Sequence, residues 1–420
     1  FMKFIHTADI HLDSPLSGLA AYKDAPTDLL RSVTRDAFTR LVDTAIDESV
    51  DFMIIAGDLY DGGWKDYNTG HYFCREMGRL DKANIPVYLL FGNHDAESEM
   101  TKKLTLPDNV HQFSSRKADT FLMNELKVAL HGRSYREAAT LENLATSYPD
   151  PVMGWLNIGV LHTALEGSAA HANYAPCSLA ELNAKGYGYW ALGHVHEHSI
   201  VQQNPSWVVF PGNLQGRHIR ETGPRGAILV TADDSGIQVV ERILVDVLRW
   251  KSIQIDASDA TSLDDVARKV GRAFSELISE TSDSIHLCVR VIINGRSTVH
   301  GALFGLESQL REEIIGQAAA QGLDRLWVEK VKIETEPLIN VAEVASRADA
   351  ISDLQAFLQE APTNPEFLTR LAEDLRPLVD RAPIELLRAV PELEAIRTGD
   401  MAQLVRSVSP GLLAYLATAD

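Results

Sequence analysis

The stretch VYLLFGNHD, residues 87–95, is an apolar run that ends abruptly at Gly92, Asn93, His94 and Asp95. A short apolar run bounded by a glycine turn is typical of a strand buried inside a parallel sheet. The carboxyl ends of such strands open into the crevice where α/β proteins bind ligands. The stretch therefore predicts an α/β fold with a polar site at one edge of a sheet.

Four other segments repeat this pattern far away along the chain. Each is a short, largely apolar run that stops at a potential metal ligand, and loops at the ends of neighbouring strands converge in space. Any one segment alone is as readily an ordinary turn, but the five together favour a site for two metal ions. The four segments are FIHTADIH (4–11), FMIIAGD (52–58), IGVLH (158–162) and YWALGHVH (189–196).

The residue types in these segments indicate which ions would bind. Carboxylates, one amide and several imidazoles suit borderline divalent ions such as Mn²⁺, Fe²⁺ or Zn²⁺ better than Ca²⁺, which prefers an all-oxygen shell. The chemistry indicated is hydrolysis of a phosphate ester.

The five segments, in this order and spacing, resemble the calcineurin-like metallophosphoesterase superfamily, whose signature is D-x-H, G-D-x-x-D, G-N-H-D/E, a lone H and G-H-x-H. The resemblance covers about residues 3–245. The flanking stretches HTADIHLD, GDLYD and PGNLQGR are most similar to the DNA-repair exonuclease branch, the SbcD-type and YhaO-like nucleases. The resemblance implies an α/β fold in which two sheets form a sandwich flanked by helices.

The resemblance also implies two ligand sets that share one aspartate. Asp58 would bridge the ions, because a carboxylate has two oxygens able to hold cations about 3.5–4 Å apart. Mn²⁺ is the expected metal, with Fe²⁺, Zn²⁺ or Mg²⁺ as alternatives. The implied ligands are Asp9, His11, Asp58 and His196 for the first ion, and Asp58, Asn93, His162 and His194 for the second.

His94 resembles the family's acid, which binds no metal and protonates the leaving oxygen or stabilises the transition state. Asp95 is expected either to orient His94 or to cap a helix, and Asp61 to support the site from outside the ligand shell. Arg217 and His218 follow a Gly-containing turn and are candidates for binding a substrate phosphate, against the alternative of an ordinary surface loop. The remaining histidines match no block and are expected to be solvated or hydrogen-bonded.

The net charge argues against the substrate that the resemblance suggests. A formal charge of −19 and a pI near 5.2 are the opposite of a basic DNA-binding surface. Any affinity for DNA must then come from the metals, from a partner, or from a local patch for which Arg217, Arg220 and Arg225 are candidates. In each case a solvated surface arginine is the simpler interpretation.

At 420 residues the chain exceeds the usual size of one hydrophobic core, so several domains are expected. We predict a catalytic domain over 2–245, a small α+β capping domain of ferredoxin-like type over 246–340, and a helical C-terminal region over 341–420. No apolar stretch reaches the ~18 residues of a membrane span. Cys74, Cys177 and Cys288 form no C-x-x-C motif and indicate free thiols in a reducing cytoplasm.

The C-terminal region carries apolar residues at helical spacing and several prolines, which predict three or four short amphipathic helices. The resemblance implies that this region binds a coiled-coil ATPase of the SbcC or YhaN kind and that the chain forms a homodimer. No Walker-type loop is present, so ATP hydrolysis would be supplied by the partner.

The resemblance thus implies a two-metal phosphodiesterase that acts on DNA as the nuclease subunit of a repair complex. The expected activity is that of an exonuclease, to which single-strand endonuclease activity can be added. One alternative is a phosphoesterase for a small molecule or protein, which the acidic charge favours. The other is a scaffold that binds an ATPase without catalysis, which the intact ligand set disfavours.

Overall fold

The computed structural model describes residues 1–16, 27–61, 66–97, 105–166, 175–303, 306–322, 325–338, 350–383, 386 and 390–417. Contacts group the chain into two compact units. The first unit contains residues 1–251 and 283–288, and the second contains 252–282 and 289–420. Within the described residues, no helix is both long and apolar enough to cross a membrane.

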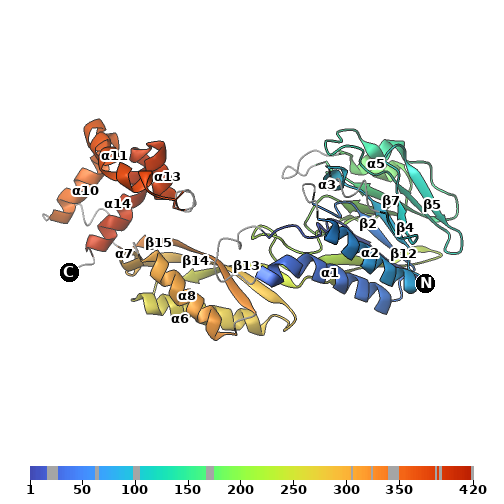
Figure 1. Ribbon diagram of the computed structural model, residues 1–420, viewed down its shortest axis with the longest axis horizontal. Coiled ribbons are helices and arrows are strands. Elements are labelled where there is room, and N and C mark those ends of the chain that lie inside the picture. Colours follow the sequence, from blue (N-terminus) through green and yellow to red (C-terminus); the bar gives the residue numbers. More distant parts are fainter. Residues whose placement is uncertain are drawn as a thin grey trace. The chain divides into compact units, whose positions relative to one another are not determined.

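Two six-stranded sheets form the first unit (Figure 1). In the first sheet, β1, β2 and β3 run parallel, and the hairpin of β11 and β12 joins it antiparallel to β1. In the second sheet, β6, β7, β8 and β10 run parallel. The first sheet has the order β12 (Gly236–Leu244), β11 (Gly226–Asp233), β1 (Met2–Thr7), β2 (Phe52–Ala56), β3 (Val87–Leu90), β4 (Val110–Gln112), and the second β5 (Asp119–Met123), β6 (Val128–Gly132), β7 (Leu156–His162), β8 (Tyr189–Gly193), β10 (Trp207–Phe210), β9 (Ser199–Gln202).

The apolar runs form strands because both faces of each sheet are covered. All five side chains of β2 are buried, as expected for a strand inside a parallel sheet. Between the sheets, Phe4 stacks on Phe52 with ring centroids 4.9 Å apart and meets Tyr189 of the second sheet edge-on. The predicted two-sheet sandwich is therefore confirmed.

Helices cover the outer faces of the sandwich. On the first sheet, Phe38 of α1 (Thr27–Asp47) and Phe73 of α2 (Tyr67–Lys82) pack in one buried cluster. On the second, Trp190 packs with Leu182 of α5 (Leu179–Ala184) and with residues of the short helix η1 (Leu144–Ser147). The remaining described helix of the first unit, α3 (Asn93–Glu97), begins shortly after β3.

Within the described residues, the second unit contains most of a three-stranded sheet, two strands of which begin in the first unit, and a set of helices. The strands lie in chain order, β13, β14 and β15, whereas the ferredoxin-like motif has four strands. The sequence predicts one helix over 299–320, whereas the structure has α7 and α8 within this range. The bounds are β13 (Leu248–Asp256), α6 (Leu263–Ser279), β14 (His286–Ser297), α7 (His300–Leu303), α8 (Glu307–Ala320) and β15 (Leu326–Pro337).

The C-terminal helices pack on one another, and α14 also packs against α7. Pro365 and Pro391 begin helices, as expected if prolines divide this region, whereas Pro377 and Pro410 lie inside helices. Residue 341, where the helical region was predicted to begin, lies outside the described residues. The helices are α10 (Ala350–Glu360), η2 (Ala361–Thr363), α11 (Pro365–Asp380), α13 (Pro391–Thr398) and α14 (Met401–Ala417).

Candidate metal centre

The polar residues predicted as ligands lie at the carboxyl ends of five strands, drawn from both sheets. The backbone holds these loops together: the N–H of Asp9 donates to the Gly57 carbonyl at 3.0 Å, and that of Thr163 to the Gly193 carbonyl at 3.1 Å. The positions are Asp9 and His11 after β1, Asp58 after β2, Asn93 after β3, His162 at the end of β7, and His194 and His196 after β8.

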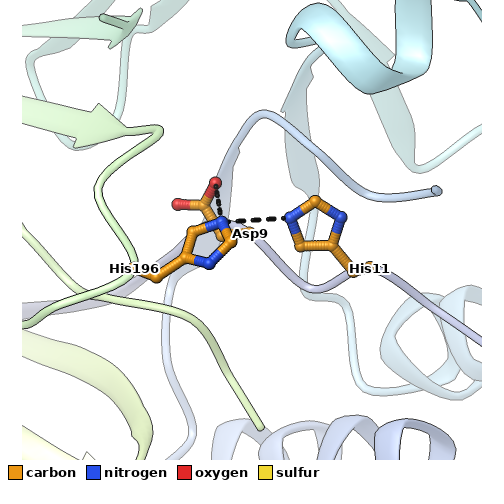
Figure 2. A group of neighbouring side chains, drawn as sticks. All are labelled: Asp9, His11 and His196. Atoms are coloured by element: carbon orange, nitrogen blue, oxygen red, sulfur yellow. Dashed lines mark hydrogen bonds and ion pairs between the residues drawn. The ribbon is translucent and has the colours of Figure 1, made fainter. Parts of the chain in front are cut away.

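Asp9, His11 and His196 form the first cluster, with one ligand atom of each within 4.8 Å of the others. Figure 2 shows the two imidazoles facing each other, with His11 Nε2 3.3 Å from His196 Nε2 and the latter 3.7 Å from a carboxylate oxygen of Asp9. Two facing ring nitrogens and a carboxylate form a donor set that suits a divalent cation.

Asp58, His162 and His194 form the second cluster. His162 Nε2 lies 3.0 Å from the side-chain oxygen of Asn93 and 3.3 Å from Asp58 Oδ2. The same Asp58 oxygen is 3.9 Å from His11 Nε2 in the first cluster. Asp58 therefore lies between the clusters, where a bridging carboxylate was predicted.

Three of the histidines have an oxygen beside Nδ1, which leaves Nε2 turned toward the clusters. His162 Nδ1 donates to the Ala56 carbonyl at 2.9 Å, and His196 Nδ1 donates to Glu221 at 2.7 Å. His11 Nδ1 is 3.6 Å from Asp61. Histidine ligands of metals are characteristically held this way through the second ring nitrogen. The side chains present thus fit two divalent ions.

The backbone at several of these positions is strained. Asp9, His11, Asp58 and His194 have positive φ angles of 50°, 45°, 53° and 99°. Residues other than glycine rarely adopt this region, and they do so where the surrounding structure enforces it, often at functional sites. The strained turns aim side chains from separate strands at a common centre.

Close approach of the loops also requires glycine. A Cβ on Gly92 would lie 2.4 Å from Asp58 Oδ1, and one on Gly57 would lie 2.3 Å from the His162 ring. Gly57 has a φ of +100° as well. Both glycines belong to the motifs that carry the ligands, so their role is to let the ligand loops touch.

Burial and mutual charge set the protonation of the site. Burial raises the pKa of Asp9. Burial acts in the same direction on Asp58, but His162, His11 and His94 outweigh it and hold the pKa of Asp58 well below its usual range. For His162, burial favours the neutral ring, yet the Asp58 charge raises its pKa to about 9. Cations bound here would have to displace this proton.

His94 lies at the rim of the clusters, with its side chain 39% exposed. Its Nδ1 is 3.3 Å from Asp61, whose other oxygen accepts from Ser14 at 3.0 Å. His94 also groups with His11 and Asp58 within 4.8 Å, so distance alone does not distinguish a proton donor from a ligand.

Asp95 does not orient the His94 ring. The structure shows its carboxylate bonded to three backbone N–H groups, those of Gly92, Leu59 and Tyr60 at 2.9–3.2 Å, and the acid that contacts the His94 ring is Asp61. Asp95 lies inside α3 rather than at its N-cap position, but it accepts from the N–H of Gly92, the residue that precedes the helix. Burial and the Asp58 charge raise the pKa of Asp95 to about 7. Asp95 fastens the G-N-H-D loop to the G-D loop.

The loop after β10 brings Arg217 to the site. Arg217 donates to the Ser14 hydroxyl at 2.9 Å. Burial lowers the pKa of His11, the contact with His11 lowers the pKa of Asp61, and the Arg217 charge acts in the same direction on both. His218, with its side chain 35% exposed, lies 3.6 Å from Glu221. The structure thus places the Arg217 side chain beside the clusters, whereas the His218 ring lies near Glu221.

Arg225 does not belong to a DNA-binding patch. Its guanidinium is 2% exposed and donates to the backbone carbonyls of His196 and Thr222 and to Asn213. Of the arginines proposed for the patch, Arg220 is exposed. Arg225 instead holds the backbone of a predicted ligand, a role that no local sequence pattern signals.

Comparison with known proteins agrees with this geometry. Residues 2–198 match the calcineurin-like phosphoesterase family, and residues 250–336 match the middle domain of metallophosphoesterase YhaO. An uncharacterized metallophosphoesterase YhaO from Bacillus subtilis (strain 168) is 30% identical over 94% of this chain and 99% of its own. The chain belongs to the calcineurin-like metallophosphoesterases. It is thus a hydrolase of phosphoesters, and it is YhaO-like along nearly its full length.

More distant relatives of this metallophosphoesterase are DNA double-strand break repair proteins Mre11. The one from Methanopyrus kandleri is 22% identical over 86% of this chain and 84% of its own, and the one from Sulfurisphaera tokodaii is 24% identical over 70% and 74%. A solved dimetal phosphatase from Danio rerio is 11% identical, covers 58% of this chain and 98% of its own, and has a TM-score of 0.35. A structural match this weak says nothing about function.

Proposed function

We propose that this metallophosphoesterase hydrolyses phosphodiester bonds in DNA, as an exonuclease and in single strands also as an endonuclease. The main support is the similarity to Mre11 repair proteins, which extends over 86% of the chain and so well beyond the catalytic motifs. Two Mn²⁺ ions, held by the seven clustered side chains, would hold the phosphoryl group and activate the attacking water. Cys74, Cys177 and Cys288, all within the described residues, form no disulfide with one another, which agrees with a reducing cytoplasm.

His94 is the proposed proton donor. Asp61 lies 3.3 Å from Nδ1, so Nε2 of this partly exposed ring, when the ring is protonated, would give a proton to the leaving sugar oxygen. Arg217, anchored on Ser14, is the proposed contact to a phosphate oxygen.

The test is cleavage by purified protein with Mn²⁺, using end-labelled single- and double-stranded DNA beside bis-p-nitrophenyl phosphate and p-nitrophenyl phosphate. Release of nucleotides, reduced about 10²- to 10⁴-fold by His94→Gln with unchanged Mn²⁺ binding, is expected for a general acid. Loss of Mn²⁺ affinity in this variant would make His94 a ligand instead.

A small-molecule or protein phosphoesterase is the second candidate, and the net charge of −19 favours it. The same assay separates the two. Rapid hydrolysis of the monoester with DNA left intact would overturn the nuclease proposal and support this candidate.

We further propose that the C-terminal helices bind a coiled-coil ATPase of the SbcC or YhaN kind. Apolar side chains are exposed there, including Leu378, which is 56% exposed on α11. Leu378→Asp should abolish co-elution of the two proteins in gel filtration, whereas Leu122→Asp, a change at a 52% exposed residue of β5, should not. Co-elution that survives Leu378→Asp would remove α11 from the interface. A capping role for the α+β segment and a homodimer remain predictions.

A further inference from the structure

Glu221 is a buried carboxylate in the loop between β10 and β11, and it directly contacts a predicted metal ligand. Its side chain is 7% exposed. One oxygen accepts from His196 Nδ1 at 2.7 Å. The other accepts from the Asn213 side chain at 2.9 Å and from the Arg217 backbone N–H at 2.7 Å. Both oxygens are therefore engaged inside the protein.

The contact with His196 fixes which ring nitrogen can face a metal. An ionised carboxylate only accepts hydrogen bonds, so His196 Nδ1 must carry the hydrogen. In the neutral ring Nε2 then keeps its lone pair, and this atom is the one that faces Asp9 and His11. The Arg225 guanidinium holds the His196 carbonyl, so ring and backbone are both anchored by this loop.

The same carboxylate fastens the loop that carries Arg217. With its backbone N–H on Glu221, Arg217 extends its guanidinium to Ser14, which donates to Asp61. Asp61 in turn contacts His94. A continuous set of polar contacts thus links the metal ligand His196 to the proposed phosphate contact and to the proposed acid.

We propose that Glu221 is a positioning residue that sets the tautomer of His196 for the first ion and holds Arg217 beside that ion. One carboxylate thereby couples metal binding to the loop that receives the substrate phosphate. The inference rests on the proposed function only in taking His196 as a ligand and Arg217 as a phosphate contact; it does not require that the substrate be DNA.

The first experiment measures Mn²⁺ binding to metal-free protein by calorimetry, with no substrate present. Glu221→Gln keeps the shape of the side chain but replaces one acceptor oxygen with an NH₂ group. One of the two Mn²⁺ sites should weaken by about 10- to 100-fold, the usual effect of losing a partner that orients a ligand, while the other is unchanged. Two sites of wild-type affinity in Glu221→Gln would overturn the proposal, whatever the protein cleaves.

Glu197→Gln is the matched control. Glu197 is the next residue after His196, but its side chain is 70% exposed and pairs with Arg225 rather than with the imidazole. Mn²⁺ affinity should be unchanged. An equal loss in both variants would mean that general charge, and not the contact with His196, is responsible.

A double-mutant cycle tests whether Glu221 acts through His196. In a His196→Asn background, Glu221→Gln should cause no further loss of Mn²⁺ affinity at the weakened site. Additive losses would contradict the coupling.

The second proposed role of Glu221, holding Arg217 beside the first ion, is tested by kinetics. Arg217→Ala should raise the KM for bis-p-nitrophenyl phosphate with Mn²⁺ affinity unchanged, whereas Glu221→Gln should change both. An unchanged KM in Glu221→Gln would contradict this role.

The tautomer can be measured without any change at Glu221, which keeps the proposal testable if Glu221→Gln does not fold. In metal-free protein labelled with ¹⁵N in its histidine rings, the His196 signal, assigned by its absence in His196→Asn, should show the hydrogen on Nδ1. A neutral ring with its hydrogen on Nε2 would overturn the proposal.

Discussion

Gly92 shows how little room the metal centre leaves around Asp58. A Cβ there would lie 2.4 Å from Asp58 Oδ1 and 2.9 Å from the backbone nitrogen of Asp58, so the bridging carboxylate would have to move. Gly92→Ala should therefore lose binding of both Mn²⁺ ions, measured by calorimetry, with the far-UV circular dichroism preserved.

Gly316→Ala on α8 is the control, because no atom lies within 4 Å of the added methyl group. It should bind Mn²⁺ as the wild type does. Full Mn²⁺ binding by Gly92→Ala would show that Asp58 does not bridge the ions.

At the scale of single residues, the sequence indicated those side chains whose spacing after apolar runs marks them. The histidines and aspartates at the strand ends come together as expected. The roles of Glu221 and Arg225 were not predicted, because a loop residue that contacts a metal ligand only in the folded structure has no characteristic spacing in the sequence. Asp95 was assigned a role by adjacency to His94, but its carboxylate turns away to three backbone N–H groups.

At the scale of elements, the close packing of β7 against β8 requires a glycine at position 159. A Cβ on Gly159 of β7 would lie 2.4 Å from ring carbons of Trp190 on β8, and this indole is fully buried. Gly159→Ala should lower the free energy of unfolding by about 1–3 kcal/mol through overpacking. Urea denaturation of the metal-free protein would measure the loss.

Gly78→Ala provides a comparison of the opposite sign. Gly78 lies in α2 with nothing within 4 Å of an added Cβ, so the variant should gain about 0.5–1 kcal/mol of helix stability. Equal effects of the two substitutions would refute the packing argument.

The apolar runs located β1, β2, β3 and β7 to within two residues, because strands buried on both faces leave a continuous apolar signal. The turn residues Asp-Asp-Ser-Gly at 233–236 also predict a hairpin, and the structure has β11 and β12 there, with Asp233 accepting from the backbone N–H of Ser235 at 2.8 Å. Two features were not foreseen, the presence of two helices, α7 and α8, in the range 299–320 and the prolines inside α11 and α14, since tertiary packing can override local propensity.

At the scale of the whole molecule, buried histidines make stability depend on pH. His6 lies between the sheets, hydrogen-bonded to Tyr189 and to the Leu192 carbonyl. Burial lowers its pKa from 6.5 to about 3. Below pH 6.5 the unfolded chain therefore binds a proton at His6 that the folded protein does not bind. The free energy of unfolding is highest above pH 6.5 and decreases as the pH falls below that value.

Between pH 7 and pH 5, His6 alone should cost about 2 kcal/mol of stability. His6→Gln should flatten the dependence of the urea midpoint on pH in metal-free protein, and His71→Gln, at an exposed position of α2, should not. An unchanged slope in His6→Gln would show that His6 does not carry this effect.

The origin of the ligands in both sheets has a consequence for the thermal behaviour of the protein. Asp9, Asp58 and Asn93 follow strands of one sheet, and His162, His194 and His196 belong to the other, so bound cations would cross-link the two halves of the sandwich. By mass action, Mn²⁺ at a hundred times its dissociation constant should add about 2.7 kcal/mol per independent site, and a chelator should remove it. Calorimetric melting with and without the chelator would measure this gain, and identical curves would mean that the folded protein binds Mn²⁺ no better than the unfolded chain does.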